Sequence, residues 1–112
     1  MPFIRIQSST PITREEEVKI KSELGQAITL IRKSEAWLMV KVEDNCRMYF
    51  KGSDEPCAVS EVMLYGKADR SAYDALTAKI TEIISDTLSI SPSRIYVKYD
   101  EISTWGYSGS NF

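Results

Sequence analysis

The chain contains no histidine, and this absence removes several kinds of active site from consideration. Zinc sites with histidine ligands, serine–histidine and cysteine–histidine nucleophile pairs, and the usual general base are all excluded. The groups that still titrate near neutral pH without a perturbed pKa are the α-amino group and the thiols. If the protein moves protons at pH 7, the amino terminus of the chain is a leading candidate for the base.

Cysteine is also scarce, with only Cys46 and Cys57 in 112 residues. Two cysteines can form one bridge, but they are few for a disulfide scaffold, so we expect free thiols in a reducing compartment. No apolar run approaches the roughly 20 residues of a membrane span, and no basic-then-apolar leader precedes the first strand. We therefore expect a mature protein close to the whole chain, cytoplasmic unless it is secreted by a route without a signal peptide.

An excess of positive charge is missing as well. Fourteen Lys and Arg face sixteen Asp and Glu, and the formal net charge is −2 at pH 7. This balance provides no excess of positive charge that would attract nucleic acid or an anionic membrane. The length, together with 43% hydrophobic and 27% charged residues, is that of one globular domain over residues 1–112.

Two halves of the sequence, about residues 2–44 and 57–101, repeat the order strand, helix, strand. In the first half, residues 3–7 alternate apolar and polar, as in a half-buried strand. Thr13 and Glu16 then fit a capping box, and an apolar face at helical spacing follows, with Arg32 and Lys33 expected in the last turn. Residues 36–44 are expected to form the second strand.

The second half predicts a strand over residues 57–66, a helix over 69–88 and a strand over 91–101. The helix carries an apolar face made of Tyr73, Leu76, Ile80, Ile83, Ile84 and Leu88. The last strands of the two halves look alike, because residues 40–44 resemble residues 97–101 at an offset of 57. Two β-α-β units in tandem are therefore expected.

These units predict an α+β fold with a four-stranded mixed sheet and both helices on one face. The other face would carry Phe3, Trp37 and Met39, whose large apolar side chains should not be exposed to solvent. Sheets with parallel strands are normally covered on both faces, so we expect burial against other subunits. Residues 47–50 and 105–107 are expected to form two short strands at sheet edges.

Several segments resemble the macrophage migration inhibitory factor and D-dopachrome tautomerase family, within the tautomerase superfamily. They are "FKGSDEPCAV", "YGK", "SISPSRIYVKYDEI" and "WGYSGSNF", taken together with Pro2, and the likeness runs from Pro2 to Phe112. The resemblance implies two β-α-β units in each subunit of a homotrimer, with the active sites between subunits.

The resemblance also implies a role for Pro2. In the family the initiator methionine is removed, and the proline becomes the N-terminal residue and the catalytic base. Without the family, a proline at the first position of a strand is unremarkable. A secondary amine on a rigid strand, with its pKa lowered by an apolar pocket and a nearby cation, suits general acid–base chemistry near neutral pH.

The remaining site residues are implied by alignment with the family. Lys33 corresponds to a lysine that binds the substrate carboxylate; without the family it reads equally well as a solvated cation at a helix end. Tyr65 corresponds to a residue whose backbone N–H contacts substrate. Tyr96 corresponds to an aromatic residue from the neighbouring subunit, and would otherwise be an ordinary strand tyrosine. Three further aromatic residues fall near the pocket wall or, alternatively, only pack at the interface: Trp105, Tyr107 and Phe112.

Two positions depart from the family pattern. Lys98 stands where the mammalian cytokines have an asparagine that touches the substrate's ring hydroxyl, so a second cation there should alter ring preference. Ser60 stands where some members complete a Cys-x-x-Cys motif, which leaves Cys57 without a resolving thiol. We therefore expect Cys57 to be a small buried apolar residue.

The sequence thus predicts a keto–enol tautomerase without cofactor or metal, acting on small aryl 2-keto acids such as phenylpyruvate or hydroxyphenylpyruvate. The alternative is a cytokine-like signalling protein that binds a receptor and for which tautomerase activity is secondary. Decarboxylation or dehalogenation by the same proline is a third option. No feature of the sequence separates these three functions.

Overall fold

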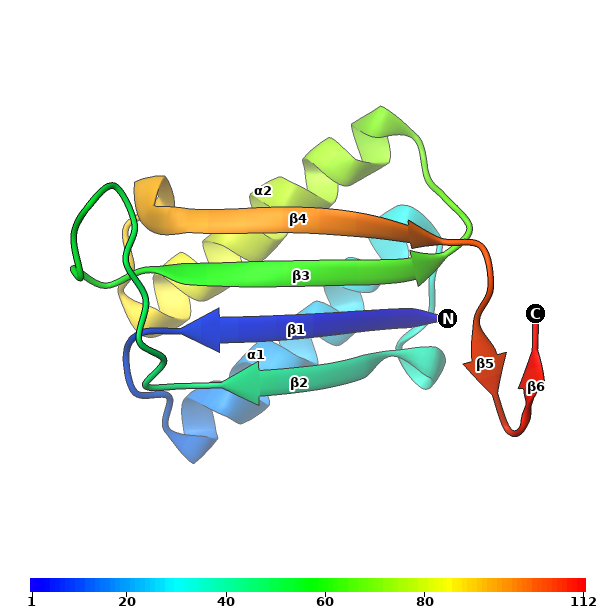
Figure 1. Ribbon diagram of the computed structural model, residues 1–112, viewed down its shortest axis with the longest axis horizontal. Helices are drawn as coiled ribbons and strands as arrows, with labels where there is room; N and C mark the ends of the chain where they lie inside the picture. The colour runs from blue at the N-terminus through cyan, green and yellow to red at the C-terminus, as the bar shows by residue number, and fades with distance from the viewer.

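The first strand, β1 (Pro2–Ser8), lies inside a four-stranded sheet of order β2-β1-β3-β4 in the computed structural model, which describes residues 1–112 (Figure 1). The other strands are β2 (Met39–Glu43), β3 (Ala58–Tyr65) and β4 (Ile95–Ile102). β1 runs parallel to β2 and antiparallel to β3, and β3 runs parallel to β4. The expected mixed sheet and α+β fold are confirmed.

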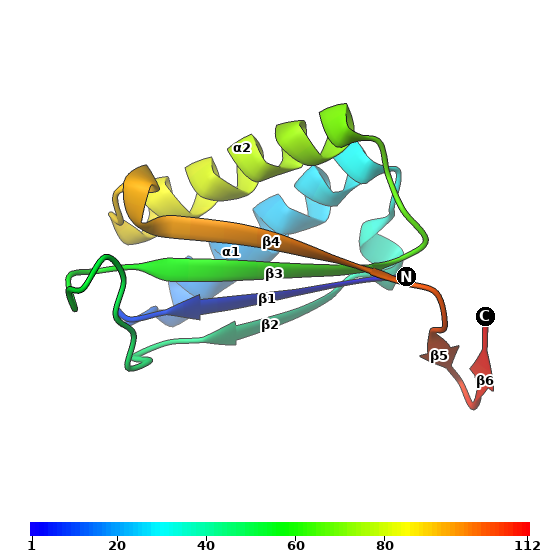
Figure 2. The same cartoon turned by 45° about the horizontal axis from the view of Figure 1, so that its top comes forward.

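Two helices, α1 (Arg14–Ala27) and α2 (Arg70–Leu88), cover one face of the sheet and leave the other open (Figure 2). The expected capping box starts α1: the Glu16 N–H donates to the Thr13 hydroxyl over 3.1 Å, and the Thr13 N–H donates to the Glu16 carboxylate over 2.9 Å. Neither helix is both long and apolar enough to cross a membrane.

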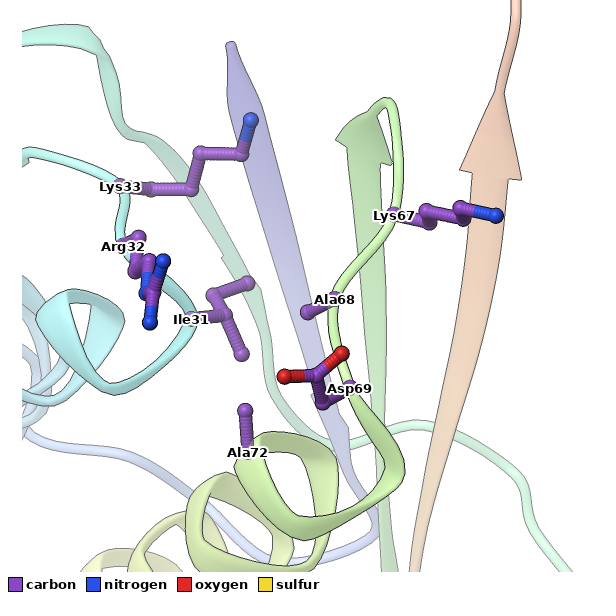
Figure 3. Close-up of a pocket in the computed structure, with 7 residues that line it drawn as sticks. All are labelled: Ile31, Arg32, Lys33, Lys67, Ala68, Asp69 and Ala72. Carbon is purple, nitrogen blue, oxygen red and sulfur yellow. The ribbon is translucent and has the colours of Figure 1, made fainter.

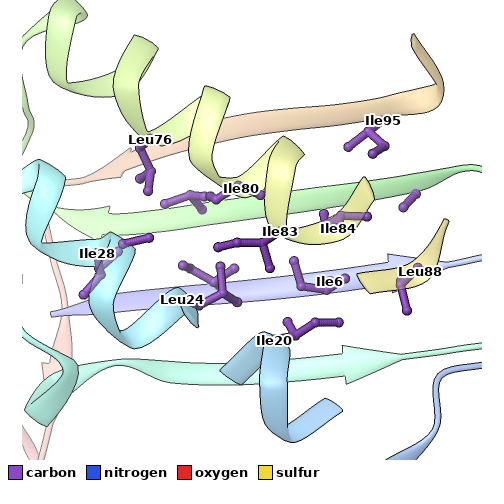
Figure 4. Close-up of a cluster of buried hydrophobic side chains, with 14 of the residues drawn as sticks. Ile6, Ile20, Leu24, Ile28, Leu76, Ile80, Ile83, Ile84, Leu88 and Ile95 are labelled. Carbon is purple, nitrogen blue, oxygen red and sulfur yellow. The ribbon is translucent and has the colours of Figure 1, made fainter. Parts of the chain in front are cut away.

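The hydrophobic core lies between the helices and the sheet (Figure 4). Helix α2 contributes the face expected from its periodicity, and β1 and β3 contribute alternate residues that point toward the helices. Fully buried side chains of this cluster include Ile4, Ile6, Ile20, Leu24, Ile28, Leu64, Leu76, Ile80 and Ile84. This packing fixes the register of the two central strands, and so the position of the first residues of β1.

The strand register supports the repeat that the sequence predicts. Ile4 of β1 lies opposite Val40 of β2, and Ser60 of β3 lies opposite Val97 of β4. Val40 and Val97, which are 57 residues apart, therefore occupy equivalent places in the two halves. By the same register the counterpart of Pro2 is Ala58, which also points toward the helices.

Several expected boundaries are wrong. Helix α1 ends at Ala27 and continues as the 3₁₀ turn η1 (Ile28–Ile31), so Arg32 and Lys33 lie beyond the helix rather than in its last turn. A second 3₁₀ turn, η2 (Glu35–Trp37), takes Trp37 out of β2. A third, η3 (Pro92–Arg94), delays the start of β4.

The two short strands expected at the sheet edges are also different in the structure. Residues 47–50 form no strand, and only an isolated bridge joins Phe50 to Ser53. At the other end of the chain, β5 (Gly106–Tyr107) pairs with β6 (Ser110–Asn111) as a separate hairpin beyond the end of the sheet (Figure 1). The hairpin therefore extends no edge of the sheet within this chain.

The open face of the sheet carries a row of charges between exposed apolar side chains. Arg5 and Glu61 pair at 2.6 Å, and Lys98 approaches Glu61 at 3.7 Å and Asp100 at 3.0 Å. Arg5 is the main cause that lowers the pKa of Glu61. The charges on this face are therefore largely compensated within the chain.

Candidate functional site at the start of the first strand

Pro2 is buried at the first position of β1, where it pairs with Leu64 of β3. A strand tolerates proline at this position because its nitrogen need not donate to the sheet. Pro2 lies on the helix-facing side of β1, as does the next residue on that side, Ile4, which is completely buried. The backbone at the start of β1 is therefore firmly placed.

Lys33 reaches this corner from the turn that follows η1. Its side chain extends from the turn toward the start of β1, whereas Lys67 of the same small cavity points away (Figure 3). The Lys33 ammonium donates a hydrogen bond to the carbonyl oxygen of Tyr65 over 2.9 Å. The turn is fixed by the left-handed conformation of Arg32, with φ of 59°, whose N–H donates back to the Thr29 carbonyl.

Tyr65 contributes its backbone to the site from the end of β3. Its N–H donates to the carbonyl oxygen of Met1 over 3.0 Å, while its own carbonyl accepts the bond from Lys33. The Tyr65 ring packs against Phe112, with ring centroids 5.8 Å apart. The backbone amide is therefore the part of Tyr65 that faces the start of β1.

The amino terminus is electrostatically perturbed. Partial burial first, and the positive charge of Lys33 second, lower the pKa of the Met1 ammonium below its ordinary value. Both causes disfavour the charged form of an amine. A terminal amine in this corner is therefore neutral over a wider pH range than an exposed one.

An apolar groove of about 650 Å³ opens beside these groups. The rings of Trp37 and Tyr107 are perpendicular with centroids 5.1 Å apart, and the rings of Tyr107 and Phe112 are stacked with centroids 6.5 Å apart. The groove is lined by Met1, Pro2, Phe3, Ala36, Trp37, Leu38, Met39, Trp105, Gly106 and Tyr107. It is wide and apolar enough to receive a planar aromatic group.

Trp37 and Met39 were expected on the open sheet face and were not expected in the groove. The turn η2 places Trp37 ahead of β2, so that it meets the C-terminal hairpin instead of the sheet. The sequence did offer one signal, since Trp37 and Trp105 are the only tryptophans of the chain and large rings often line ligand sites.

Tyr96 and Lys98 do not join this site within one chain. Tyr96 pairs with Val59, five positions along β3 from the partner of Pro2, which is about 17 Å at the rise of a strand. Lys98 lies three positions away, and two carboxylates, Asp100 before Glu61, raise the pKa of its ammonium. The positive charge of Lys98 is thus largely neutralised by these two carboxylates.

The structure brings no metal-binding cluster together: no three of its Cys, Asp and Glu side chains are placed to hold an ion. Cys57 is buried, as expected, and Cys46 is partly exposed; both are free thiols. The hydroxyl of Ser60 is buried without a hydrogen-bond partner. The groups that the structure places at the corner at β1 are the terminal amine, Lys33, the Tyr65 backbone amide and aromatic rings.

Comparisons with known proteins agree with this fold. The family model described as macrophage migration inhibitory factor matches residues 1–112. A macrophage migration inhibitory factor homolog of Brugia malayi is 25% identical over 100% of this chain and 99% of its own length, and the factor of Meriones unguiculatus is 26% identical over the same shares.

Solved structures give the same result. Leishmania major MIF2 has a TM-score of 0.95 and 26% identity, covering 100% of this chain and 97% of its own. A homologue from Prochlorococcus marinus has a TM-score of 0.90 and 28% identity over 98% of each chain. The whole-length match of sequence and fold shows that this chain belongs to the macrophage migration inhibitory factor family.

Proposed function

We propose that this chain is a cofactor-free keto–enol tautomerase of the phenylpyruvate type, with Pro2 as its general acid and base once Met1 has been removed. The observation that carries the proposal is the convergence of three groups at the start of β1. They are a buried proline nitrogen, the ammonium of Lys33 and the backbone N–H of Tyr65. Family membership supports a tautomerase-type isomerase in general, and the choice of substrate is our own inference.

The Pro2 nitrogen would be the base. Removing Met1 converts the Pro2 amide into a secondary amine at a position that is more buried than Met1. Burial and Lys33 already lower the pKa of an amine one residue further out, so the same causes should act on Pro2. A base whose pKa lies near the ambient pH is the most effective for proton transfer.

The reaction needs only one proton to move between two atoms. The neutral amine takes a proton from the carbon next to the ketone, and the C–H electron pair forms the enol double bond. The resulting ammonium returns a proton to the oxygen, which has taken up the carbonyl electron pair. Ketonisation is the reverse. No oxidant, reductant or metal enters this balance.

The carbonyl group of Met1 indicates where an oxygen atom of the substrate would bind. Its oxygen accepts from the Tyr65 N–H, which shows that an oxygen acceptor fits 3.0 Å from that nitrogen. Removing Met1 leaves the N–H without this partner, so an oxygen of a 2-keto acid can take its place. Lys33, beside it, would hold the carboxylate, and the aromatic groove would take the ring.

We further propose that the protein works as a homotrimer in which Tyr96 belongs to the site of a neighbouring copy. In one chain Tyr96 is about 17 Å along the sheet from Pro2. Yet Tyr96 and Met39 expose 63% and 66% of their surfaces on the open face, which favours burial against another copy.

A signalling role remains the second candidate, because the mammalian relatives carry the name of a cytokine. It would require a receptor and an outer surface of the assembly rather than the groove. Blocking the Pro2 amine separates the two functions, since signalling would survive that modification and tautomerisation would not.

The proposal is tested with protein whose N-terminus is confirmed by mass spectrometry. The interconversion of enol and keto phenylpyruvate is measured by ultraviolet absorbance. The processed form should catalyse it, and the form that retains Met1 should not, because its proline nitrogen is acylated. Full activity with Met1 in place would contradict the mechanism. Inactivity of the processed form toward both phenylpyruvate and hydroxyphenylpyruvate would contradict the substrate class.

A further inference from the structure

The loop between β2 and β3 is tied to the beginning of β4 by a single side chain, Arg94. Figure 1 shows this loop folding against the end of the sheet opposite to the amino terminus. The Arg94 guanidinium donates to four backbone carbonyls of the loop: Phe50 at 3.0 Å, Ser53 at 3.2 Å, Glu55 at 2.9 Å and Pro56 at 2.9 Å. No other side chain of the protein makes as many hydrogen bonds to one backbone segment.

The loop places Phe50 at a defined position. Phe50 and Ser53 exchange backbone N–H···O bonds of 2.9 and 3.1 Å, which close a tight turn. The two residues between them, Lys51 and Gly52, have positive φ angles of 54° and 76°, as such a turn requires. Arg94 also lies over the Phe50 ring, with its guanidinium carbon 5.4 Å from the centroid.

Phe50 in turn contacts the ring of Tyr96. The two centroids are 4.7 Å apart, and the planes are inclined by 52°. Tyr96 stands on the open face of β4, an edge strand, and 63% of its surface is exposed. Phe50 is therefore its ring partner within the chain, and the orientation of the Tyr96 ring depends on where the loop holds Phe50.

We infer that Phe50 and Arg94 are positioning residues that present the Tyr96 ring, in a preformed orientation, to the substrate pocket of the neighbouring copy. This inference rests on the proposed function, in which Tyr96 completes that pocket. A ring fixed before binding loses less conformational freedom when substrate arrives, so the benefit should appear as tighter binding. The base and Lys33 are at the other end of the sheet and should be unaffected.

We call the four hydrogen bonds from Arg94 to the loop the clamp. A purely structural role for this clamp makes a different prediction. If Arg94 only held the loop on the protein, its loss would lower stability or weaken assembly, and any loss of activity would follow the loss of assembly. If Phe50 acts through Tyr96, its effect on KM must disappear once Tyr96 no longer carries a ring. A double-mutant cycle between Phe50 and Tyr96 separates these cases.

The experiment measures phenylpyruvate kinetics for Phe50→Leu, Tyr96→Leu and the double variant, with light scattering to confirm an unchanged assembly. We expect Phe50→Leu to raise KM about two- to tenfold, the range that a pair of aromatic rings contributes, with kcat within about twofold. Phe50→Tyr keeps a ring and should restore KM. In the Tyr96→Leu background, Phe50→Leu should change KM by less than about twofold, since its partner is gone.

The clamp itself is tested with Arg94→Lys, because one ammonium cannot replace a planar guanidinium that serves four carbonyls. Amide hydrogen exchange at Phe50 and Ser53 should become faster, and KM should rise as in Phe50→Leu. Arg70→Lys is the matched control, since Arg70 is an exposed residue of α2 that pairs only with Asp74, and it should change neither.

The outcomes distinguish the inference from the proposed function. An unchanged KM in Phe50→Leu, together with a raised KM in Tyr96→Leu, would overturn the inference and leave the proposed function standing. Fully additive losses in the double variant would also overturn it, because Phe50 would then act independently of Tyr96. A processed wild-type protein without activity would overturn the proposed function, and the inference with it.

Discussion

Replacing Lys33 with methionine should change substrate affinity and the pH dependence of the rate together. Lys33 is the cation whose charge acts on the amino terminus, and its ammonium lies at hydrogen-bond distance from the Tyr65 carbonyl. Methionine keeps the length and the apolar stem of the side chain but removes the charge. The backbone of the turn depends on Arg32 and Thr29, so it should stay in place.

The size of the effect on binding follows from the bond that is lost. A hydrogen bond to a charged group contributes about 1.5–3 kcal/mol, and each 1.4 kcal/mol is about tenfold, so KM should rise about 10- to 100-fold. The carboxylate is held equally in the ground state and in the transition state, so kcat should change little.

The effect on pH has a definite sign. Lys33 is the second cause, after burial, that lowers the pKa of the terminal amine, so its removal should raise that pKa. The base works only when it is neutral, and activity is lost as the pH falls through its pKa. The acidic limb of the kcat/KM profile, which reports the free enzyme, should therefore move to higher pH.

The assay is the ketonisation of enol phenylpyruvate between pH 5 and 9, with Lys67→Met as the control. Lys67 borders the same small cavity but points away from β1 (Figure 3), so its loss should leave KM and the pH profile nearly unchanged. If Lys33→Met left both KM and the acidic limb unchanged, Lys33 would have no part in the site.

Other variants test the base, the ion pairs and the core. Pro2→Gly should keep the fold but lose most of the activity, measured by circular dichroism and the same assay, because a flexible primary amine is poorly positioned. Lys98→Asn should change the ranking among ring-substituted arylpyruvates while leaving the free energy of unfolding nearly unchanged, because Lys98 is half exposed and Glu61 keeps Arg5. Ile80→Ala, at a fully buried position, should lower that free energy by about 2–5 kcal/mol in urea titration. Light scattering should give a trimer, and a stable monomer at micromolar concentration would contradict the shared site.

The regular elements were predictable from the sequence because their signals are local. The capping box at Thr13 and the apolar face of α2 depend on residues three or four positions apart. The pairing of Val40 and Val97 with equivalent partners followed from the repeat. The roles of Pro2, Lys33 and Tyr65 were implied only by the family resemblance, and they stay predictions, although the structure does place Lys33 against the Tyr65 backbone.

The irregular segments were not predictable, because their conformation depends on competing hydrogen bonds. The Thr29 hydroxyl donates to the Gln26 carbonyl over 2.8 Å, beside the point where α1 tightens into a 3₁₀ turn. The loop that carries Phe50 is held by Arg94, 44 residues further along the chain, and no local pattern contains that information. The charge of Lys98 is likewise neutralised in part by Glu61, which lies on another strand and is distant in sequence.

The two halves of the fold place different chemical groups at equivalent positions. Ala58, the counterpart of Pro2, is preceded by Cys57 within the chain, so its nitrogen is an amide and cannot act as a base. The corner around Ala58 carries Arg94, Phe50 and Tyr96 in place of an amine. In the proposed mechanism only the half that begins at Pro2 can therefore supply a base, whereas the equivalent end of the other half holds the aromatic ring that we propose to meet substrate in a neighbouring copy.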